Sequence, residues 1–136
     1  MGFEEMVLQL LASFPNSSLL YVKNEENIVL QLEVIVHKPS NTYVRLTDCN
    51  DVTGIKRCVI EQLSRPIIKG IPYKTEKHNK EFRASLLKSL NRFLKTDFSE
   101  EDMTFIYAHL GNGIKHSVAT QFVKHDFDMV WLKNQF

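Results

Sequence analysis

The chain has 136 residues and a formal net charge of +1, with 43% hydrophobic and 24% charged residues. This size and balance are typical of one globular domain that buries a core. Its apolar runs are far shorter than the roughly 20 residues that a membrane span needs, and the acidic opening GFEE at residues 2–5 is unlike a signal peptide. We therefore expect a single domain over residues 1–136, located in the cytoplasm and not in a membrane.

The charges are distributed unevenly along the chain. Residues 1–64 carry five basic and eight acidic side chains, residues 65–95 carry nine and two, and residues 96–136 carry three and six. The middle segment therefore has a net charge of +7 between two segments of −3. A local excess of lysine and arginine is typical of a solvated helix face, and it is also what a surface for an anionic partner requires.

The first 64 residues predict a helix, a three-stranded meander and a second helix. Apolar residues recur three and four positions apart over residues 3–14, which predicts an amphipathic helix that stops at Pro15. The stretches SLLYVK, IVLQLEVIVH and TYVRLTD follow, separated by NEEN and KPSN, whose residue types favour tight connections. Positions 28, 30, 32, 34 and 36 are all apolar. One face of the middle strand is therefore predicted to pack under the first helix.

The remaining sequence predicts helices. A cap at Asn50 or Asp51 begins a helix that we expect to end before Pro66, and IIKGIPYKT is then a connector. Residues 76–95 carry the clearest helical periodicity, and Ser99 with Asp102 resembles a capping box for the next helix. We expect an α+β fold in which a three-stranded antiparallel meander is packed by an N-terminal helix and a C-terminal set of about four helices. Its two parts would be residues 1–64 and 65–136.

The stretch LGNGIKH at residues 110–116 is predicted to connect two helices. Gly111 stands where a helix C-terminus favours a left-handed residue, and Asn112 and Gly113 extend the turn. A Walker-type phosphate loop needs Gly, four residues and then Gly-Lys-Ser/Thr after a strand, and this stretch does not have that spacing. We therefore interpret it as a bend and not as a phosphate site.

The cysteines and histidines do not complete a metal motif. Cys49 and Cys58 stand nine residues apart without a Cys-x-x-Cys unit, so we interpret them as small core or boundary residues and expect neither a disulfide framework nor a zinc finger. His109, His116 and His125 are separated by seven and nine residues, so no two of them share the i, i+4 face of a helical metal pair.

Catalytic constellations are also incomplete. Cys49 stands among short polar residues, but nothing in the sequence places a histidine that would activate its thiol. Glu33, His37 and Lys38 are the nearest approach to the carboxylate and lysine set of a metal-dependent nuclease, and they read as the polar face of a strand. We therefore predict a protein that is not an enzyme and uses no cofactor or metal.

The helix predicted over residues 76–95 has a basic side. At about 100 degrees per residue, four cations collect opposite its apolar stripe, interrupted by Glu81: Lys77, Lys88, Arg92 and Lys95. Arg83 falls within the apolar stripe, where we expect its head group to reach an acidic partner. With Lys69 and Lys74 from the preceding connector, these four cations are our candidate residues for binding a protein partner or nucleic acid. Without interleaved aromatic residues, such a face would bind a nucleic acid by its backbone.

The order helix, three antiparallel strands, helix over residues 3–64 resembles the layout of double-stranded RNA-binding domains. Those domains anchor phosphates with lysines at the start of their second helix. Here that place holds Gly54, Ile55, Lys56 and Arg57, with Asp51 just ahead. The resemblance is one of topology alone.

Two C-terminal stretches suggest another class of protein. EDMTFIYAHLGN at residues 101–112 and ATQFVKHDFDM at residues 119–129 resemble segments of small accessory proteins from phages and mobile elements of Gram-positive bacteria. This resemblance implies stoichiometric binding to a host protein, including inhibition of defence enzymes such as CRISPR nucleases, as anti-CRISPR proteins do. The alternative is nucleic-acid binding through the basic face of the 76–95 helix. The oligomeric state stays open.

Overall fold

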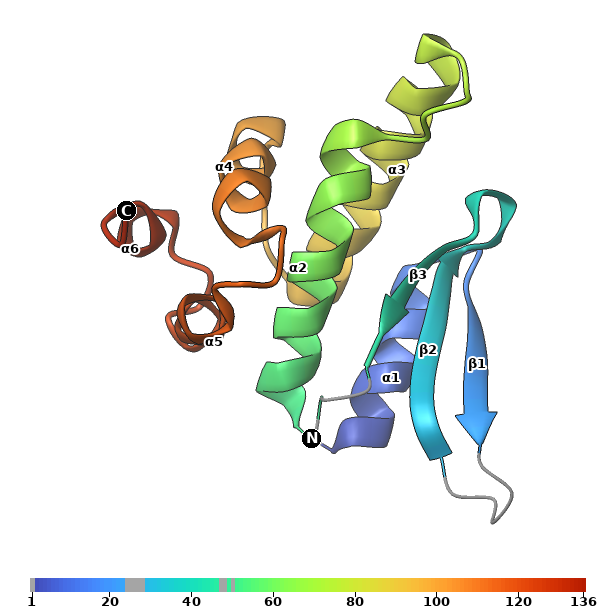
Figure 1. Cartoon of the computed structure of the whole chain (residues 1–136), viewed down its shortest axis with the longest axis horizontal. Helices are drawn as coiled ribbons and strands as arrows, with labels where there is room; N and C mark the ends of the chain where they lie inside the picture. The colour runs from blue at the N-terminus through green and yellow to red at the C-terminus, as the bar shows by residue number, and fades with distance from the viewer. Residues whose placement is uncertain (1, 24–28, 47–48, 50) are drawn as a thin grey trace.

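A computed structural model describes residues 2–23, 29–46, 49 and 51–136 of the chain (Figure 1). The helices in these residues are α1 (Phe3–Ser13), α2 (Val52–Lys69), α3 (Glu76–Leu94), α4 (Glu100–Leu110), α5 (His116–Lys124) and α6 (Met129–Lys133). The strands are β1 (Ser18–Lys23), β2 (Val29–His37) and β3 (Thr42–Arg45). The predicted α+β class is confirmed. Within the described ranges, no helix is both long and apolar enough to cross a membrane.

The strands pair antiparallel in the order β1-β2-β3, with β2 in the centre. A short 3-10 turn, Lys38–Ser40, joins β2 to β3, and Asn41 closes it in the left-handed region. The connection between β1 and β2 lies outside the described residues. Val34 and Val36 are buried, as the alternating pattern predicts. Position 28 and the side chains at positions 30 and 32, predicted on the same face, are outside the described part.

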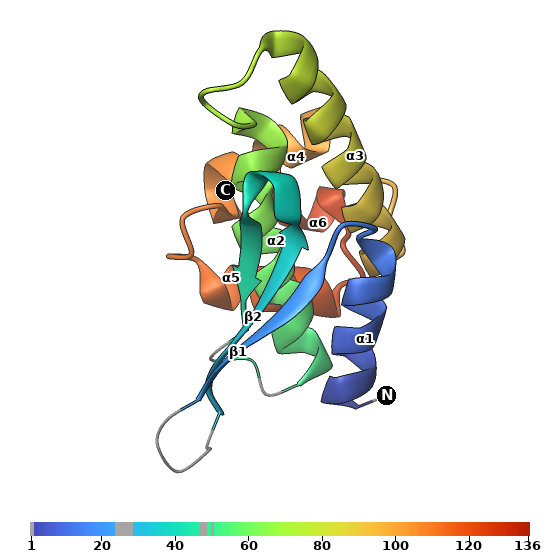
Figure 2. The ribbon, with the colours of Figure 1, turned by 90° about the vertical axis from the view of Figure 1, so that its right-hand side faces the viewer.

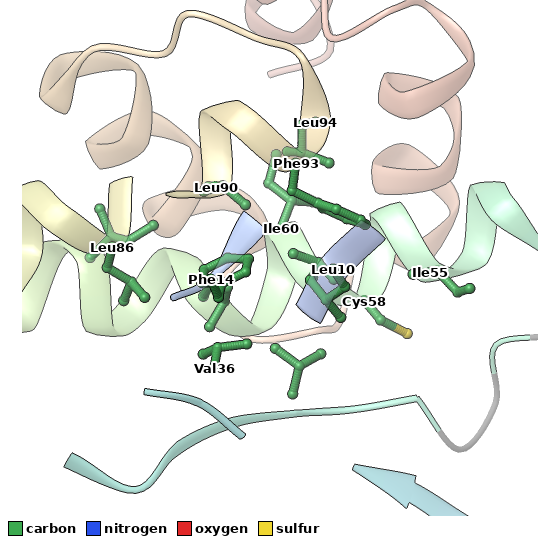
Figure 3. Close-up of a cluster of buried hydrophobic side chains, with 14 of the residues drawn as sticks. Leu10, Phe14, Val36, Ile55, Cys58, Ile60, Leu86, Leu90, Phe93 and Leu94 are labelled. Carbon is green, nitrogen blue, oxygen red and sulfur yellow. The ribbon is translucent and has the colours of Figure 1, made fainter. Parts of the chain in front are cut away.

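One apolar core joins the sheet to the helices. Figure 3 shows Phe14, the C-cap of α1, among Val36 of β2 and Leu86 and Leu90 of α3, and all four belong to one cluster of buried residues. α2 contacts β3, α3, α4 and α5. It therefore lies between the sheet on one side and α4–α6 on the other (Figures 1 and 2).

α2 runs four residues further than the sequence predicts. We expected it to end before Pro66, but it continues to Lys69 with the proline inside. Proline removes one helical hydrogen bond and crowds the preceding turn, at a cost of about 3 kcal/mol. Leu63 and Ile67 are almost fully buried on either side of it. Burial of this apolar face outweighs the local preference of proline, and the connector shortens to residues 70–75.

The two glycines of the LGNGIKH turn are required by different structural constraints. Gly111 was expected in the left-handed region, and this was wrong, because its φ is −71° and its ψ is −6°. The left-handed residue is Gly113, with φ of 71°. A Cβ atom at Gly111 would lie 2.6 Å from Tyr107 Cδ1 and 3.0 Å from Ser64 Oγ. Its distance from the Tyr107 carbonyl oxygen would also be 2.6 Å, so Gly111 is required mainly by the last turn of its own helix α4, with Ser64 of α2 close behind.

The two cysteines form a disulfide, which their interpretation as small core or boundary residues did not predict. Both are buried, as expected. Cys49 precedes α2 and Cys58 lies inside it. Asp51 caps α2 by accepting a hydrogen bond from the Gly54 N–H, and Cys49 packs beside Gly54 in the first turn of the helix. This position brings its sulfur within bonding distance of the Cys58 sulfur, one turn further along α2.

Candidate interaction surface

The connection between α2 and α3 is held by a side-chain clamp. Gly70 ends α2 with φ of 68°, and Ile71 returns to the core with 6% of its surface exposed. The Asn79 Oδ1 accepts a hydrogen bond from the Ile71 N–H at 2.5 Å, and its Nδ2 donates to the Ile71 and Lys74 carbonyl oxygens. Thr75 then caps the first turn of α3. This clamp fixes where α3 begins and which way it faces.

The six predicted binding residues are all exposed. We call them the basic surface: Lys69, Lys74, Lys77, Lys88, Arg92 and Lys95. Lys77, Lys88 and Arg92 follow one face of α3, and Lys95 is its C-cap. The buried residues of α3 lie opposite this face: Phe82, Leu86, Ser89, Leu90, Phe93 and Leu94. The other two have aromatic neighbours, because the Lys69 Nζ lies 5.7 Å from the ring of Tyr107 in α4, and the Lys74 Nζ lies 5.8 Å from the ring of Tyr73.

The cations of the basic surface carry no described ion pair. The ion pairs of the described residues join Arg45 to Glu33, Arg57 and His116 to Glu61, and Arg83 to Glu100, and none involves the basic surface. Arg92 donates a hydrogen bond to the Ser13 carbonyl oxygen at 3.3 Å, which ties α3 to α1. The positive charges of the basic surface are therefore available to bind an anionic partner.

Tyr73 is a candidate that the sequence analysis missed. Its side chain lies in the α2–α3 connection and is 77% exposed, more than any other large hydrophobic residue in the described part of the chain. Its signal in the sequence was an aromatic residue directly after Pro72 in a short connector between two helices. Tyr73 adds an apolar group to one end of the basic surface.

Arg83 has the structural role that its position in the apolar stripe suggests. Its Nη2 lies 3.5 Å from the Glu100 Oε1, so the head group reaches a carboxylate at the start of α4. The Nε atom is buried and makes no hydrogen bond within the described residues. Arg83 therefore links α3 to α4 and stays apart from the exposed cations.

A second polar cluster joins α2 to α5. Glu61 is 5% exposed, and its carboxylate lies 3.0 Å from the Arg57 Nη1 and 2.9 Å from the His116 Nδ1. Sequence spacing alone could have found the Arg57 and Glu61 pair, which stand four apart on one helix. It could not have found His116, which comes from beyond the glycine turn. The cluster satisfies a buried carboxylate and fixes the start of α5 on α2.

The weaker catalytic and metal candidates have structural partners. Glu33 pairs with Arg45 across the sheet at 3.1 Å, and the His37 Nδ1 bonds to the Ser40 hydroxyl at 2.7 Å. Burial, with His78 nearby as a smaller cause, lowers the pKa of His37 below its usual value. His125 stacks on Trp131. In the part of the chain that the structure describes, no group of three or more His, Cys, Asp or Glu residues could hold a metal ion.

Comparison of this chain with protein-family models, curated proteins and solved structures finds no match.

Proposed function

We propose that this chain is a non-enzymatic binding protein that engages a protein partner stoichiometrically through the basic surface. The observation that carries the proposal is the set of exposed cations without described ion pairs along α3 and the segments at its two ends. Exposed charges of one sign repel one another in the free protein, and an acidic partner would relieve that repulsion.

Two acidic residues favour a protein partner over nucleic acid. Glu76 and Glu81 are exposed in the first half of α3, close in sequence to Lys77. A phosphate backbone would be repelled at both positions, whereas a protein surface can present a mixture of charges.

The resemblance of the two C-terminal stretches to phage and mobile-element proteins suggests the class of partner. Small accessory proteins of phages and mobile elements commonly block a host factor by occupying its surface. On this basis the partner is a bacterial defence enzyme, such as a CRISPR nuclease, and the chain is its inhibitor in the cytoplasm. The second candidate is binding of DNA or RNA by the same surface, favoured by the length of α3. Its 19 residues extend over about 28 Å, enough to follow several phosphates.

A pull-down from a bacterial lysate, with and without nuclease treatment, tests the proposal. The key variant carries Lys77→Glu, Lys88→Glu and Lys95→Glu, which spares the Arg92 hydrogen bond to α1. The matched control carries Lys115→Glu, Lys124→Glu and Lys133→Glu, three exposed lysines of the C-terminal helices.

We expect the wild type and the control to retain one protein in near-equal amount, with or without nuclease, and the key variant to lose it. Equal retention by all three proteins would contradict a role for the basic surface. Loss of the captured protein after nuclease treatment would favour the nucleic-acid alternative.

A further inference from the structure

The turn between α2 and α3 presents an aromatic side chain at one end of the molecule. In both views the turn projects past the sheet and the C-terminal helices (Figures 1 and 2). Tyr73 lies on this turn with 77% of its surface exposed, whereas the neighbouring Ile71 is buried. The turn is therefore anchored in the core at Ile71 and exposed to solvent at Tyr73, which we call its tip.

The tip is built rigidly. The Lys74 N–H donates to the Ile71 carbonyl oxygen at 3.2 Å, and the Asn79 side chain spans the same turn from α3 with three hydrogen bonds. A side chain on such a turn loses little backbone freedom when it is bound, which raises the affinity available from a single contact.

One lysine lies beside Tyr73, and others are close to it in the sequence. The Lys74 Nζ lies 5.8 Å from the Tyr73 ring, and Lys69, Lys77 and Lys80 are exposed nearby in the sequence. Tyrosine is one of the residues most enriched among the dominant contacts of protein interfaces, and such residues act from the centre of a patch that excludes water. Together, the Tyr73 ring and the nearby lysines would suit a pocket on a partner protein that is apolar inside and has carboxylates around its rim.

We propose that Tyr73 is the anchor by which the basic surface docks, and that its occupant is a pocket on the partner protein that is apolar at its base and lined at its rim by Asp and Glu. This inference rests on the proposed function and specifies the chemistry of the partner. Charge complementarity selects the acidic rim, because the tip carries lysines without described ion pairs. Glu76, exposed at the first position of α3, disfavours a nucleic-acid strand in the same place.

Photo-crosslinking tests the anchor. Benzoylphenylalanine replaces Tyr73 in one protein and Tyr43 in the control. Tyr43 serves as the control site, because it is also exposed, at 38%, and also has a cation over its ring, with Arg45 Cζ at 5.3 Å, but it lies on β3. After illumination in a bacterial lysate, we expect the probe at position 73 to form an adduct with a partner segment rich in Asp and Glu. The probe at position 43 should give no such adduct.

The test is completed by measuring the affinity of each Tyr variant for the partner protein identified by crosslinking. We expect Tyr73→Ala to weaken binding by about tenfold or more, Tyr73→Phe to bind within about twofold of wild type, and Tyr43→Ala to leave binding unchanged. Circular dichroism melts of the variants confirm that each is folded.

Several results would overturn the anchor. These are the absence of an adduct at position 73, an adduct with nucleic acid or with a second copy of this chain, and an adduct without acidic residues nearby. Binding that is lost on reversal of the α3 lysines but unaffected by Tyr73→Ala would refute the anchor while leaving the proposed function in place. Binding that is indifferent to both changes would refute both.

Discussion

At the scale of single residues, sequence identifies special positions more reliably than the reasons for them. LGNGIKH was correctly interpreted as a turn between helices, and both of its glycines have structural roles. The left-handed φ was assigned to Gly111 because helix C-termini favour it there, whereas Gly113 adopts it. The true constraint on Gly111 is space: a Cβ there would overlap Tyr107 one turn earlier in α4 and would also crowd Ser64 of α2. Sequence patterns do not contain a contact between residues so far apart in the chain.

Alanine at each glycine of this turn should separate the two constraints. In Gly111→Ala the new Cβ would overlap Tyr107 and crowd the fully buried Ser64, so we expect a loss of about 2 to 3 kcal/mol in unfolding free energy. In Gly113→Ala the Cβ has only ordinary contacts with His116, and the left-handed φ should cost about 1 kcal/mol. Urea unfolding of both variants measures the difference. A larger loss at Gly113 would contradict the packing explanation.

At the scale of elements, strong periodicity was predictive and local rules at the helix ends were less so. The bounds of α3 agree closely with the 76–95 prediction, and its apolar stripe is the face that packs. The capping box of Ser99 and Asp102 is present with both hydrogen bonds. The proline rule failed at Pro66, because burial of Ile67 decides the end of α2. The disulfide was missed because pairing depends on how the chain packs where it enters α2, which spacing alone does not give.

The Asn79 clamp should control the α2–α3 connection. Asn79→Ala removes three hydrogen bonds and leaves the Ile71 N–H without its partner, so we expect a loss of about 1 to 3 kcal/mol in unfolding free energy. Lys80→Ala, at the adjacent exposed position, should change stability by less than about 0.5 kcal/mol. Denaturant unfolding measures both. Native-state hydrogen exchange should also show loss of protection at Ile71 and Lys74 in Asn79→Ala alone. Unchanged protection there would contradict the clamp.

At the scale of the whole molecule, part of the charge excess of residues 65–95 lies on one exposed face, whereas Lys69 and Arg83 turn toward α4. The +7 segment supplies α3 and its preceding turn, and helical spacing correctly placed Lys77, Lys88, Arg92 and Lys95 on an exposed face. Lys69 departs from this face because it turns toward Tyr107 in α4. The exposed Tyr73 was not predicted, since exposure of a connector residue depends on how the two helices meet.

The central claim is that the basic surface serves a protein partner and not nucleic acid. The most direct measurement is a mobility-shift titration of the purified chain with duplex DNA and with RNA at about 150 mM salt. We expect only weak, non-specific retention, with Kd of about 10⁻⁴ M, because the −3 segments on either side of the +7 segment nearly cancel its charge in the field of the whole molecule. Submicromolar binding to either nucleic acid, lost in the Lys77→Glu, Lys88→Glu, Lys95→Glu variant but not in its matched control, would contradict the claim.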